Sequence, residues 1–385
     1  MSTVVHSVRV VDEGRIRDDG WVRFEGGRIA STGTGSSWRD APDAATVVDG
    51  AALAGDEALL APGFIDLHGH GGGGFSYDDG PDAIRAARAL HRAYGTTRAV
   101  LSLVTASLDE LERKVAEIAD LTTTDDDILG SHLEGPFLDP DHKGAHDPAL
   151  LREPNAAAVE RLLHAGRGTI RQVTLAPELQ GGLDAIRAVV AAGAAAAVGH
   201  TAADAAEARA AFDAGATILT HAFNAMPPLH HREPGPVGAA ASDDRVTLEI
   251  IADGVHLDPA VVGIAFAAAP GRIALVTDAM AAAGAPDGVY QLGSLSVEVE
   301  GGTARLAGGG AIAGSTLTQD AALRRAVASG VAVADAVAAL TRVPARAIGR
   351  ADDLGGLTPG MLADAVLLSA GLQVRAVWVA GALVP

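Results

Sequence analysis

The stretch GFIDLHGHGGGGF, residues 63–75, contains the first side chains that could do chemistry. His68 and His70 are alternate residues, so on an extended chain both side chains share one face, which suits a metal site. The glycines 71–74 could instead form a loop that binds phosphate, because glycine runs after a strand are typical of such loops. The stretch alone leaves both hypotheses open.

Further imidazole and carboxylate groups follow other short apolar runs along the chain. With the first two histidines, the set is His68, His70, Glu134, His200, His221 and Asp278. A single histidine or aspartate at such a place is more often a core residue or a helix cap. Five run ends that all carry such groups would be a coincidence of independent structural roles, so we interpret the set as a metal site. Imidazole and carboxylate ligands suit Zn, Fe, Co or Mn.

The ligand set also predicts a type of reaction. A divalent ion lowers the pKa of bound water and polarises a carbonyl, which makes a nucleophile available near neutral pH. Asp278, which ends the last run, is the expected general base. The sequence therefore favours a metal-dependent hydrolase.

The runs that carry these residues alternate with alanine-rich helical stretches. They cover residues 64–68, 97–104, 128–134, 171–177, 195–200, 217–221, 246–253 and 272–278. Eight β/α units over about 280 residues are typical of a (β/α)8 TIM barrel, an α/β fold whose active site lies at the C-terminal ends of the strands. The alternative is an open doubly wound sheet, which usually has fewer strands.

Both ends of the chain are rich in short strands and turns. We expect residues 1–60 and 345–385 to pair into one small β-sandwich domain, with no helix in the first segment. The barrel would then span 61–344, with a β insertion at about 286–314 at its rim, followed by a helix that begins near Ser315 and Thr316.

Composition excludes several classes of partner. The net charge of -19 and pI of about 5.0 argue against nucleic acid and against anionic membranes. The chain has no cysteine, so disulfides and thiolate metal sites are excluded. The N-terminal segment does not read as a signal peptide and no run is apolar enough to span a membrane, so we expect a cytoplasmic protein.

Over essentially its whole length the chain resembles the amidohydrolase superfamily, and within it the N-acetylglucosamine-6-phosphate deacetylases. The broader resemblance rests on PGFIDLHGH, the histidines at the run ends, Asp278 and GGLTPGMLADAVLL. The narrower one rests on SHLEGPFLDPDHKGAH (131–146), GHT (199–201), THAFNAMPPLHHREPG (220–235), IADGVH (251–256) and VTDAMAAAG (276–284). It implies removal of the acetyl group from N-acetyl-D-glucosamine 6-phosphate, in amino-sugar catabolism and cell-wall sugar recycling.

The resemblance also implies how the metals are held. Many amidohydrolases bridge two ions with a carboxylated lysine after the fourth strand, but both lysines here, Lys114 and Lys143, lie elsewhere. The resemblance gives this role to Glu134, which would bind a first ion with His200 and His221. Because His68 and His70 are both present, a second and weaker ion is expected, and zinc is the leading candidate for both.

Substrate contacts are implied in the same way. Arg232 and His256 match positions that contact phosphate, and Arg232 would reach in from the neighbouring subunit of a homodimer. An arginine fork suits phosphate, although without its motif Arg232 would read as a surface ion pair. His146 would hydrogen-bond the substrate carbonyl or its oxyanion. The expected sugar-contacting positions are Ala145, His146, Asn224, Ala225, Ile312, Ala313 and Gly314.

Other histidines and other functions need separate hypotheses. His91 and His164 lie in helical stretches and are expected to be solvated or helix-capping. One alternative function is an amidohydrolase that opens a cyclic amide or acts on a related N-acyl sugar, and another is a barrel that has lost catalysis and serves as an assembly module. Whether the N-acetylgalactosamine or N-acetylmannosamine phosphates are also accepted stays open.

Overall fold

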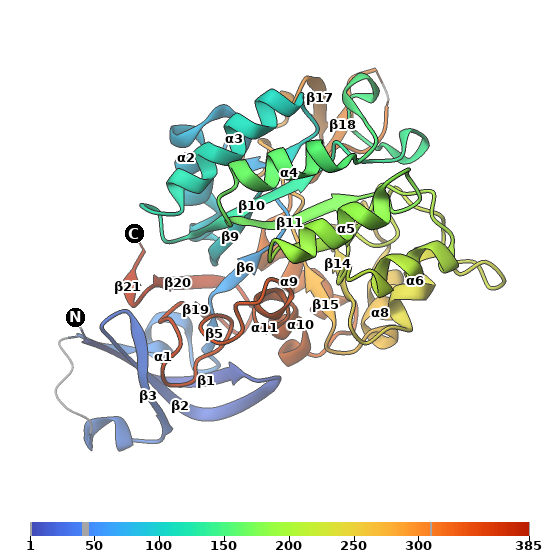
Figure 1. Ribbon diagram of the computed structural model, residues 1–385. Helices are drawn as coiled ribbons and strands as arrows, with labels where there is room; N and C mark the ends of the chain where they lie inside the picture. Colours follow the sequence, from blue (N-terminus) through green and yellow to red (C-terminus); the bar gives the residue numbers. More distant parts are fainter. Residues whose placement is uncertain (1, 41–45, 309, 385) are drawn as a thin grey trace.

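A computed structural model describes residues 2–40, 46–308 and 310–384, and its centre is a barrel of eight parallel strands (Figure 1). The expected (β/α)8 barrel is confirmed. In spatial order its strands are β6 (Phe64–Asp66), β9 (Thr96–Val104), β10 (Ile128–Glu134), β11 (Ile170–Leu175), β12 (Ala195–Val198), β13 (Ile218–Leu219), β14 (Thr247–Ile250) and β15 (Ile273–Leu275). The first and last strands are joined beyond their ends, where the Asp278 amide donates to the His68 carbonyl at 2.8 Å.

Helices surround this sheet and bury its outer face. They are α2 (Pro81–Ala93), α3 (Leu108–Leu121), α4 (Ala156–Ala165), α5 (Gly182–Ala191), α6 (Ala205–Asp213), α7 (Gly235–Ala241), α8 (Pro259–Ala268), α9 (Gln319–Ala328), α10 (Val333–Leu340) and α11 (Arg342–Ala347). Several begin at caps that the sequence encodes, such as the capping boxes at Ser107 of α3 and Asp204 of α6. The core between helices and strands is mainly Val, Leu, Ile and Ala.

Six barrel strands are shorter than the apolar runs that predicted them. β12 and β13 end two residues before His200 and His221, and β15 ends three residues before Asp278. These three residues have φ of 48°, 27° and 48°, in the left-handed region that non-glycine residues seldom adopt. The chain therefore leaves the ladder just before each of them.

The two chain ends form one eight-stranded sheet beside the barrel, as the blue and red strands in Figure 1 show. Its strands are β1 (Ser2–Asp12), β2 (Arg15–Glu25), β3 (Arg28–Thr34), β4 (Thr46–Asp49), β5 (Leu59–Pro62), β19 (Ala365–Leu368), β20 (Val374–Val379) and β21 (Ala382–Leu383). The sheet has its own apolar core, which includes Phe24, Leu60 and Trp378. The ends of the chain thus fold into a separate unit.

The expectation that residues 1–60 contain no helix is wrong. A short 3-10 helix covers Ser37–Asp40, and α1 covers Gly50–Ala54. The Asp49 carboxylate accepts hydrogen bonds from the Ala51 and Ala52 amides, which caps α1 at its N-terminus. One turn of helix is too short to give a periodic apolar pattern.

The rim insertion is a three-stranded antiparallel sheet of β16 (Gly288–Leu292), β17 (Leu295–Glu300) and β18 (Thr303–Leu306). The helix that follows begins at Gln319 rather than near Ser315. Ser315 is unavailable because its amide donates to the Asp278 carbonyl at 2.7 Å and its hydroxyl to the Thr277 carbonyl at 2.5 Å. The start of this segment is thus fixed to the loop that carries Asp278.

Among the residues that the structure describes, no helix has both the length and the apolar character needed to cross a membrane.

Candidate active site

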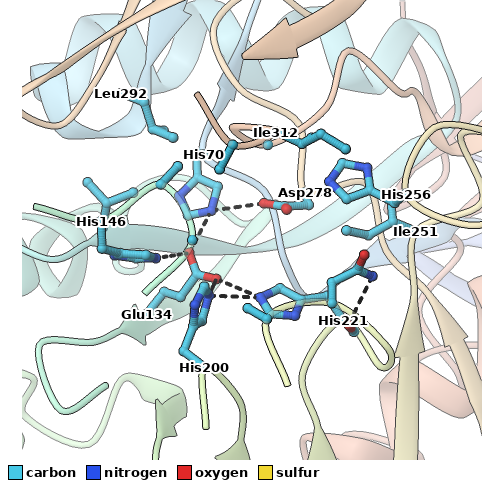
Figure 2. A pocket seen from close by; sticks show the side chains of 17 residues that line it. His70, Glu134, His146, His200, His221, Ile251, His256, Asp278, Leu292 and Ile312 are labelled. Carbon is cyan, nitrogen blue, oxygen red and sulfur yellow. Dashed lines mark hydrogen bonds and ion pairs between the residues drawn. The ribbon is translucent and has the colours of Figure 1, made fainter. Parts of the chain in front are cut away.

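All six residues that the sequence predicts as metal ligands gather at the C-terminal ends of the barrel strands, with Glu134 at the centre. Figure 2 labels five of them, all but His68. Glu134 Oε1 lies 3.1 Å from His200 Nε2 and 3.2 Å from His221 Nε2. The same oxygen lies 3.3 Å from His68 Nε2, and Oε2 lies 3.1 Å from His70 Nε2. His146 Nε2 lies 3.6 Å from Oε2, so one carboxylate faces five imidazole rings.

Asp278 lies on the other side of the first two histidines. Its Oδ1 is 3.1 Å from His70 Nε2 and 3.5 Å from His68 Nε2. His68, His70 and Asp278 have ligand atoms close enough to share one ion, and so do Glu134, His146 and His200. All of these side chains are buried. The geometry offers two adjacent groups that could hold a metal, and Glu134 contacts both.

The histidines differ in how the site affects their charge. Burial opposes protonation of His68, but the negative charges of Glu134 and Asp278 outweigh it and raise its pKa well above the usual range. His70 behaves alike: against burial, Asp278 and Glu134 raise its pKa to about 9. For His200 and His221, burial prevails over the contact with Glu134 and lowers the pKa. The site thus favours positive charge on His68 and His70 and neutral imidazoles at His200 and His221.

The donor set fits a cation. The Nδ1 of His200 lies 2.9 Å from the His142 carbonyl and must donate to it, so Nε2 of the neutral ring bears a lone pair. That lone pair faces the Glu134 carboxylate and lies 2.9 Å from His221 Nε2. A buried lone pair and a carboxylate that face each other have no proton to share, and a positive ion between them would compensate both.

Three of these residues have unusual backbone conformations. His200, His221 and Asp278 all have positive φ, and so do Phe223 and Ala225 in the loop after β13. Such conformations cost free energy and cluster at functional sites, where the surrounding structure maintains them. At these strand ends they turn the side chains toward the barrel axis.

A cavity of about 320 Å³ opens above the ligand residues. Of the predicted site residues, those that line it are His70, Glu134, Ala145, His146, His200, His221, Asn224, Ala225, His256, Asp278, Ile312 and Gly314. His68 lies behind this layer and Ala313 is fully buried beside it. Leu292 is the last residue of β16 in the rim insertion and Ile312 follows β18, and Figure 2 shows them on the side opposite Glu134. The rim insertion thus forms part of the cavity wall.

Arg232 is the one predicted site residue that the structure keeps away from this cavity. It is exposed, in the loop between β13 and α7. His256, its predicted partner in phosphate binding, lines the cavity, and its Nδ1 lies 2.7 Å from Asp253 Oδ2. Burial lowers the pKa of His256, but the Asp253 carboxylate outweighs this and raises it.

The glycines after His70 form a hairpin. β7 (Gly71–Gly72) pairs with β8 (Phe75–Ser76), and the two residues between them have φ of 65° and 90°. Positive φ at both central positions of a two-residue turn is the conformation that glycine allows. Any side chain on Gly71 would collide with the Phe75 carbonyl, since its Cβ would lie 2.2 Å from that oxygen. The run serves a tight turn beside the ligands.

The prediction that His91 is solvated or helix-capping is wrong. His91 is only 2% exposed, and its Nε2 donates to the Gly71 carbonyl at 2.8 Å. Through this hydrogen bond His91 stabilises the hairpin of β7 and β8. His164 is exposed, as expected.

Two buried residues at the site went unnoticed in the sequence. His132, two residues before Glu134 on β10, lies edge-on to His68 with ring centroids 4.6 Å apart. Glu249, on β14, lies 3.3 Å from His68 Nδ1. A carboxylate inside the apolar run VTLEIIAD was the available signal for Glu249, since a strand buried on both faces is usually apolar throughout.

Comparisons with known proteins agree with this geometry. Residues 59–384 match the amidohydrolase family. An N-acetylgalactosamine-6-phosphate deacetylase of Escherichia coli O157:H7 is 44% identical, covering 85% of this chain and 88% of that protein. An N-acetylglucosamine-6-phosphate deacetylase of Bos taurus is 38% identical, covering 85% and 83%. A solved structure of a mutant N-acetyl-D-glucosamine-6-phosphate deacetylase from Mycobacterium smegmatis, in complex with N-acetyl-D-glucosamine-6-phosphate, superimposes with a TM-score of 0.91 at 43% identity, over 100% of this chain and 99% of that one.

Proposed function

The chain belongs to the amidohydrolase family, and from this membership we propose that it hydrolyses the acetamide of N-acetyl-D-glucosamine 6-phosphate to D-glucosamine 6-phosphate and acetate. The observation that carries the proposal is the convergence of Glu134 with four histidines and Asp278 beneath a cavity of about 320 Å³. Such a volume lies within the range of small-molecule sites.

Two groups of residues would hold metal ions. Glu134, His200 and His221 form the first, and His68, His70 and Asp278 the second, with zinc as the proposed ion. When bound, a divalent ion supplies a Lewis acid that polarises the substrate carbonyl and eases deprotonation of water. The rest of the chemistry is assigned to side chains of this chain.

Asp278 is the proposed general base. Although burial raises the pKa of this carboxyl, the positive charge of His68 and the contact with His70 lower it to about 2, so it is ionised at neutral pH. It takes the proton of the attacking water and then returns it to the departing sugar amine. A carboxylate that faces the cavity is free to exchange this proton with substrate.

His146 is the proposed hydrogen-bond donor to the substrate carbonyl. Its Nδ1 lies 2.8 Å from the Thr105 hydroxyl, and its Nε2 lies 3.6 Å from Glu134 Oε2. Because an ionised carboxylate only accepts, Nε2 carries the proton, and this N–H can serve the carbonyl oxygen as negative charge develops on it.

The phosphate is assigned to His256 and Arg232. His256 lines the cavity, and although burial lowers its pKa, the Asp253 carboxylate outweighs this and raises it, which favours a dianion nearby. Because Arg232 is exposed and outside its own cavity, we propose that it serves the cavity of a second copy in a homodimer. Ala145, Asn224, Ala225 and the 312–314 segment are the proposed sugar contacts.

The N-acetylgalactosamine phosphate is a second candidate substrate. The observation that favours it is the 44% identity with the Escherichia coli deacetylase of that sugar, against 38% for the Bos taurus enzyme. The two sugars differ only in the orientation of one hydroxyl, which a few contacts decide.

Acetate release from three N-acetyl sugars, with ring opening of one cyclic amide measured beside it, tests the proposal. We expect turnover of N-acetylglucosamine 6-phosphate, and kcat/KM lower by about 100-fold or more for unphosphorylated N-acetylglucosamine, because a charged hydrogen-bonding site is left unpaired. N-acetylgalactosamine 6-phosphate decides between the two candidate sugars. A cyclic amide such as dihydroorotate serves as the control for the ring-opening alternative, and turnover of it alone would contradict the proposal.

Nucleic acid and membranes are not expected as partners of this acidic chain, and a cytoplasmic location stays a prediction.

A further inference from the structure

Glu249 is a buried carboxylate that none of the roles above uses. Its side chain is 0% exposed, and it projects from β14 toward the metal-ligand residues. A buried carboxylate is unfavourable unless hydrogen bonds and positive charge compensate it. Within the described ranges, the ion pair that Glu249 makes is with His68, at 3.3 Å. Its charge is therefore directed at the candidate metal site.

Residues of other barrel strands hold this carboxylate in place. Oε1 accepts a hydrogen bond from Gln172 Nε2 on β11 at 2.8 Å. Oε2 accepts one from the backbone amide of His221 at 3.4 Å, and the Glu249 carbonyl accepts from the Ala222 amide at 2.8 Å. The side chain thus contacts a residue of each ligand group, the ring of His68 in one and the backbone of His221 in the other.

The contact fixes which nitrogen of His68 faces the other ligand residues. A carboxylate accepts, so the Nδ1 that faces Glu249 carries a proton, and when the ring is neutral, as metal binding requires, Nε2 bears the lone pair. That Nε2 is the atom directed at Glu134 and Asp278. With the opposite tautomer, an N–H would point to the place where an ion would bind.

The other histidines of the site lack such a partner. Nδ1 of His200 donates to a neutral backbone carbonyl, and Nδ1 of His70 and of His221 has no hydrogen-bond partner among the described residues. His132 packs against His68, but its two nitrogens bond Ser102 and Thr174 and do not compete for Glu249. Among these rings, His68 alone has a carboxylate behind it.

We propose that Glu249 is a positioning residue that holds His68 in this tautomer and so sets the affinity of the His68, His70 and Asp278 group for a divalent ion. The proposal rests on the metal site of the proposed function. Carboxylates behind metal-binding imidazoles typically change metal affinity by about 10- to 100-fold when mutated. The second ion then depends on a residue that does not touch it.

Metal titration without substrate tests this. Protein stripped with a chelator is titrated with Zn²⁺, the ions bound per chain are counted, and each Kd is measured by competition with a chromophoric chelator. We expect Glu249→Gln to weaken the second ion by about 10- to 100-fold and to leave the tighter ion unchanged, because a neutral amide oxygen holds the Nδ1–H of His68 less firmly than a carboxylate does and leaves Nε2 less basic. Gln172 Oε1 has no partner at present and can accept from the new amide, so the variant should fold.

Two further variants separate positioning from a loss of buried charge. Glu249→Asp keeps the charge on a shorter side chain, so its affinity for the second ion should lie between those of the wild type and the glutamine variant. Asp66→Asn is the matched control, because Asp66 is also buried but accepts from the His68 backbone amide at 3.2 Å rather than from the ring. It should bind both ions normally.

An unchanged second Kd in Glu249→Gln overturns the proposal, and so does an equal loss in Asp66→Asn or in Glu249→Asp. If the glutamine variant does not fold, Glu249→Asp decides alone: a loss of about threefold or more supports the proposal and an unchanged Kd overturns it. Acetate release by the wild type is scored separately. A protein that binds two ions but releases no acetate contradicts the proposed function and not this inference.

Discussion

At the scale of single residues, the site depends on charges that would be unfavourable alone. Asp278 and Glu134 are both buried, and the pKa of each is held low because imidazole groups outweigh the effect of burial. Burial raises a carboxyl pKa by default, so ionised carboxylates here require those partners.

Asp278→Asn should keep the fold and the tighter ion while kcat falls by about 10³-fold or more, because the amide cannot accept the proton of the attacking water. Steady-state acetate release beside metal analysis measures both quantities. A variant that keeps a tenth of the wild-type kcat would identify another residue as the base.

The buried imidazole of His91 should make stability depend on pH. Burial lowers its pKa to about 4, against 6.5 for the unperturbed group. Between these values the unfolded chain binds a proton that the folded chain does not, so stability falls as pH falls from about 6.5 to about 4. In His91→Gln, the side-chain amide can still donate to the Gly71 carbonyl but does not titrate. The part of the stability loss that comes from His91 should therefore be absent in this variant.

Urea unfolding at pH 7 and pH 5 measures this difference. Between pH 7 and pH 5, the free energy of unfolding should fall by about 2 kcal/mol more in the wild type than in His91→Gln. The same loss in both proteins would mean that His91 is not the group that titrates.

At the scale of elements, the eight strand ends bring the site together, and this was predictable. Buried parallel strands have apolar sequences, and a barrel brings the residues that follow its strands together at one end. The exact strand ends were not predictable, because the positive φ of His200 and Asp278 depends on the completed packing around them. Glu249 was missed since a lone charge in an apolar run does not reveal its partner, which lies 181 residues away.

One buried ion pair links the barrel to the sheet of the chain ends. Arg98 on β9 donates to both oxygens of Asp364, at 2.6 and 2.9 Å, just before β19. Both side chains are at most 6% exposed. Arg98→Met should destabilise the protein by about 3–5 kcal/mol, because it leaves a buried carboxylate uncompensated.

Denaturant unfolding measures this cost, with Arg187→Met as the control. Arg187 pairs with Asp184 at 2.7 Å on the exposed face of α5, so its loss should cost at most about 1 kcal/mol. Equal costs for the two variants would show that the Arg98 pair does not join the two units.

At the scale of the whole molecule, the position of Arg232 matters most. It lies outside the cavity of its own chain, and the proposal that it serves a second copy predicts complementation between defective chains. Arg232→Ala and Asp278→Asn chains should each be nearly inactive on the phosphorylated sugar. In a mixed dimer, the Arg232→Ala chain keeps Asp278 and receives Arg232 from its partner.

Equal amounts of the two variants, unfolded and refolded together, should therefore recover about a quarter of the wild-type activity, since half of the dimers are mixed and each has one intact site. Refolding each variant alone is the control. No recovery in a mixture that contains mixed dimers would place Arg232 in the cavity of its own chain or outside the reaction.

The central claim, that this barrel is a metal-dependent deacetylase of a phosphorylated amino sugar, is tested most directly by acetate release from stripped protein as Zn²⁺ is added back. The predicted result is no release of acetate from N-acetylglucosamine 6-phosphate without metal and recovery as the Glu134, His200 and His221 group fills. Full activity in protein shown to be metal-free would contradict the account, and so would a metal-loaded protein that leaves the substrate intact.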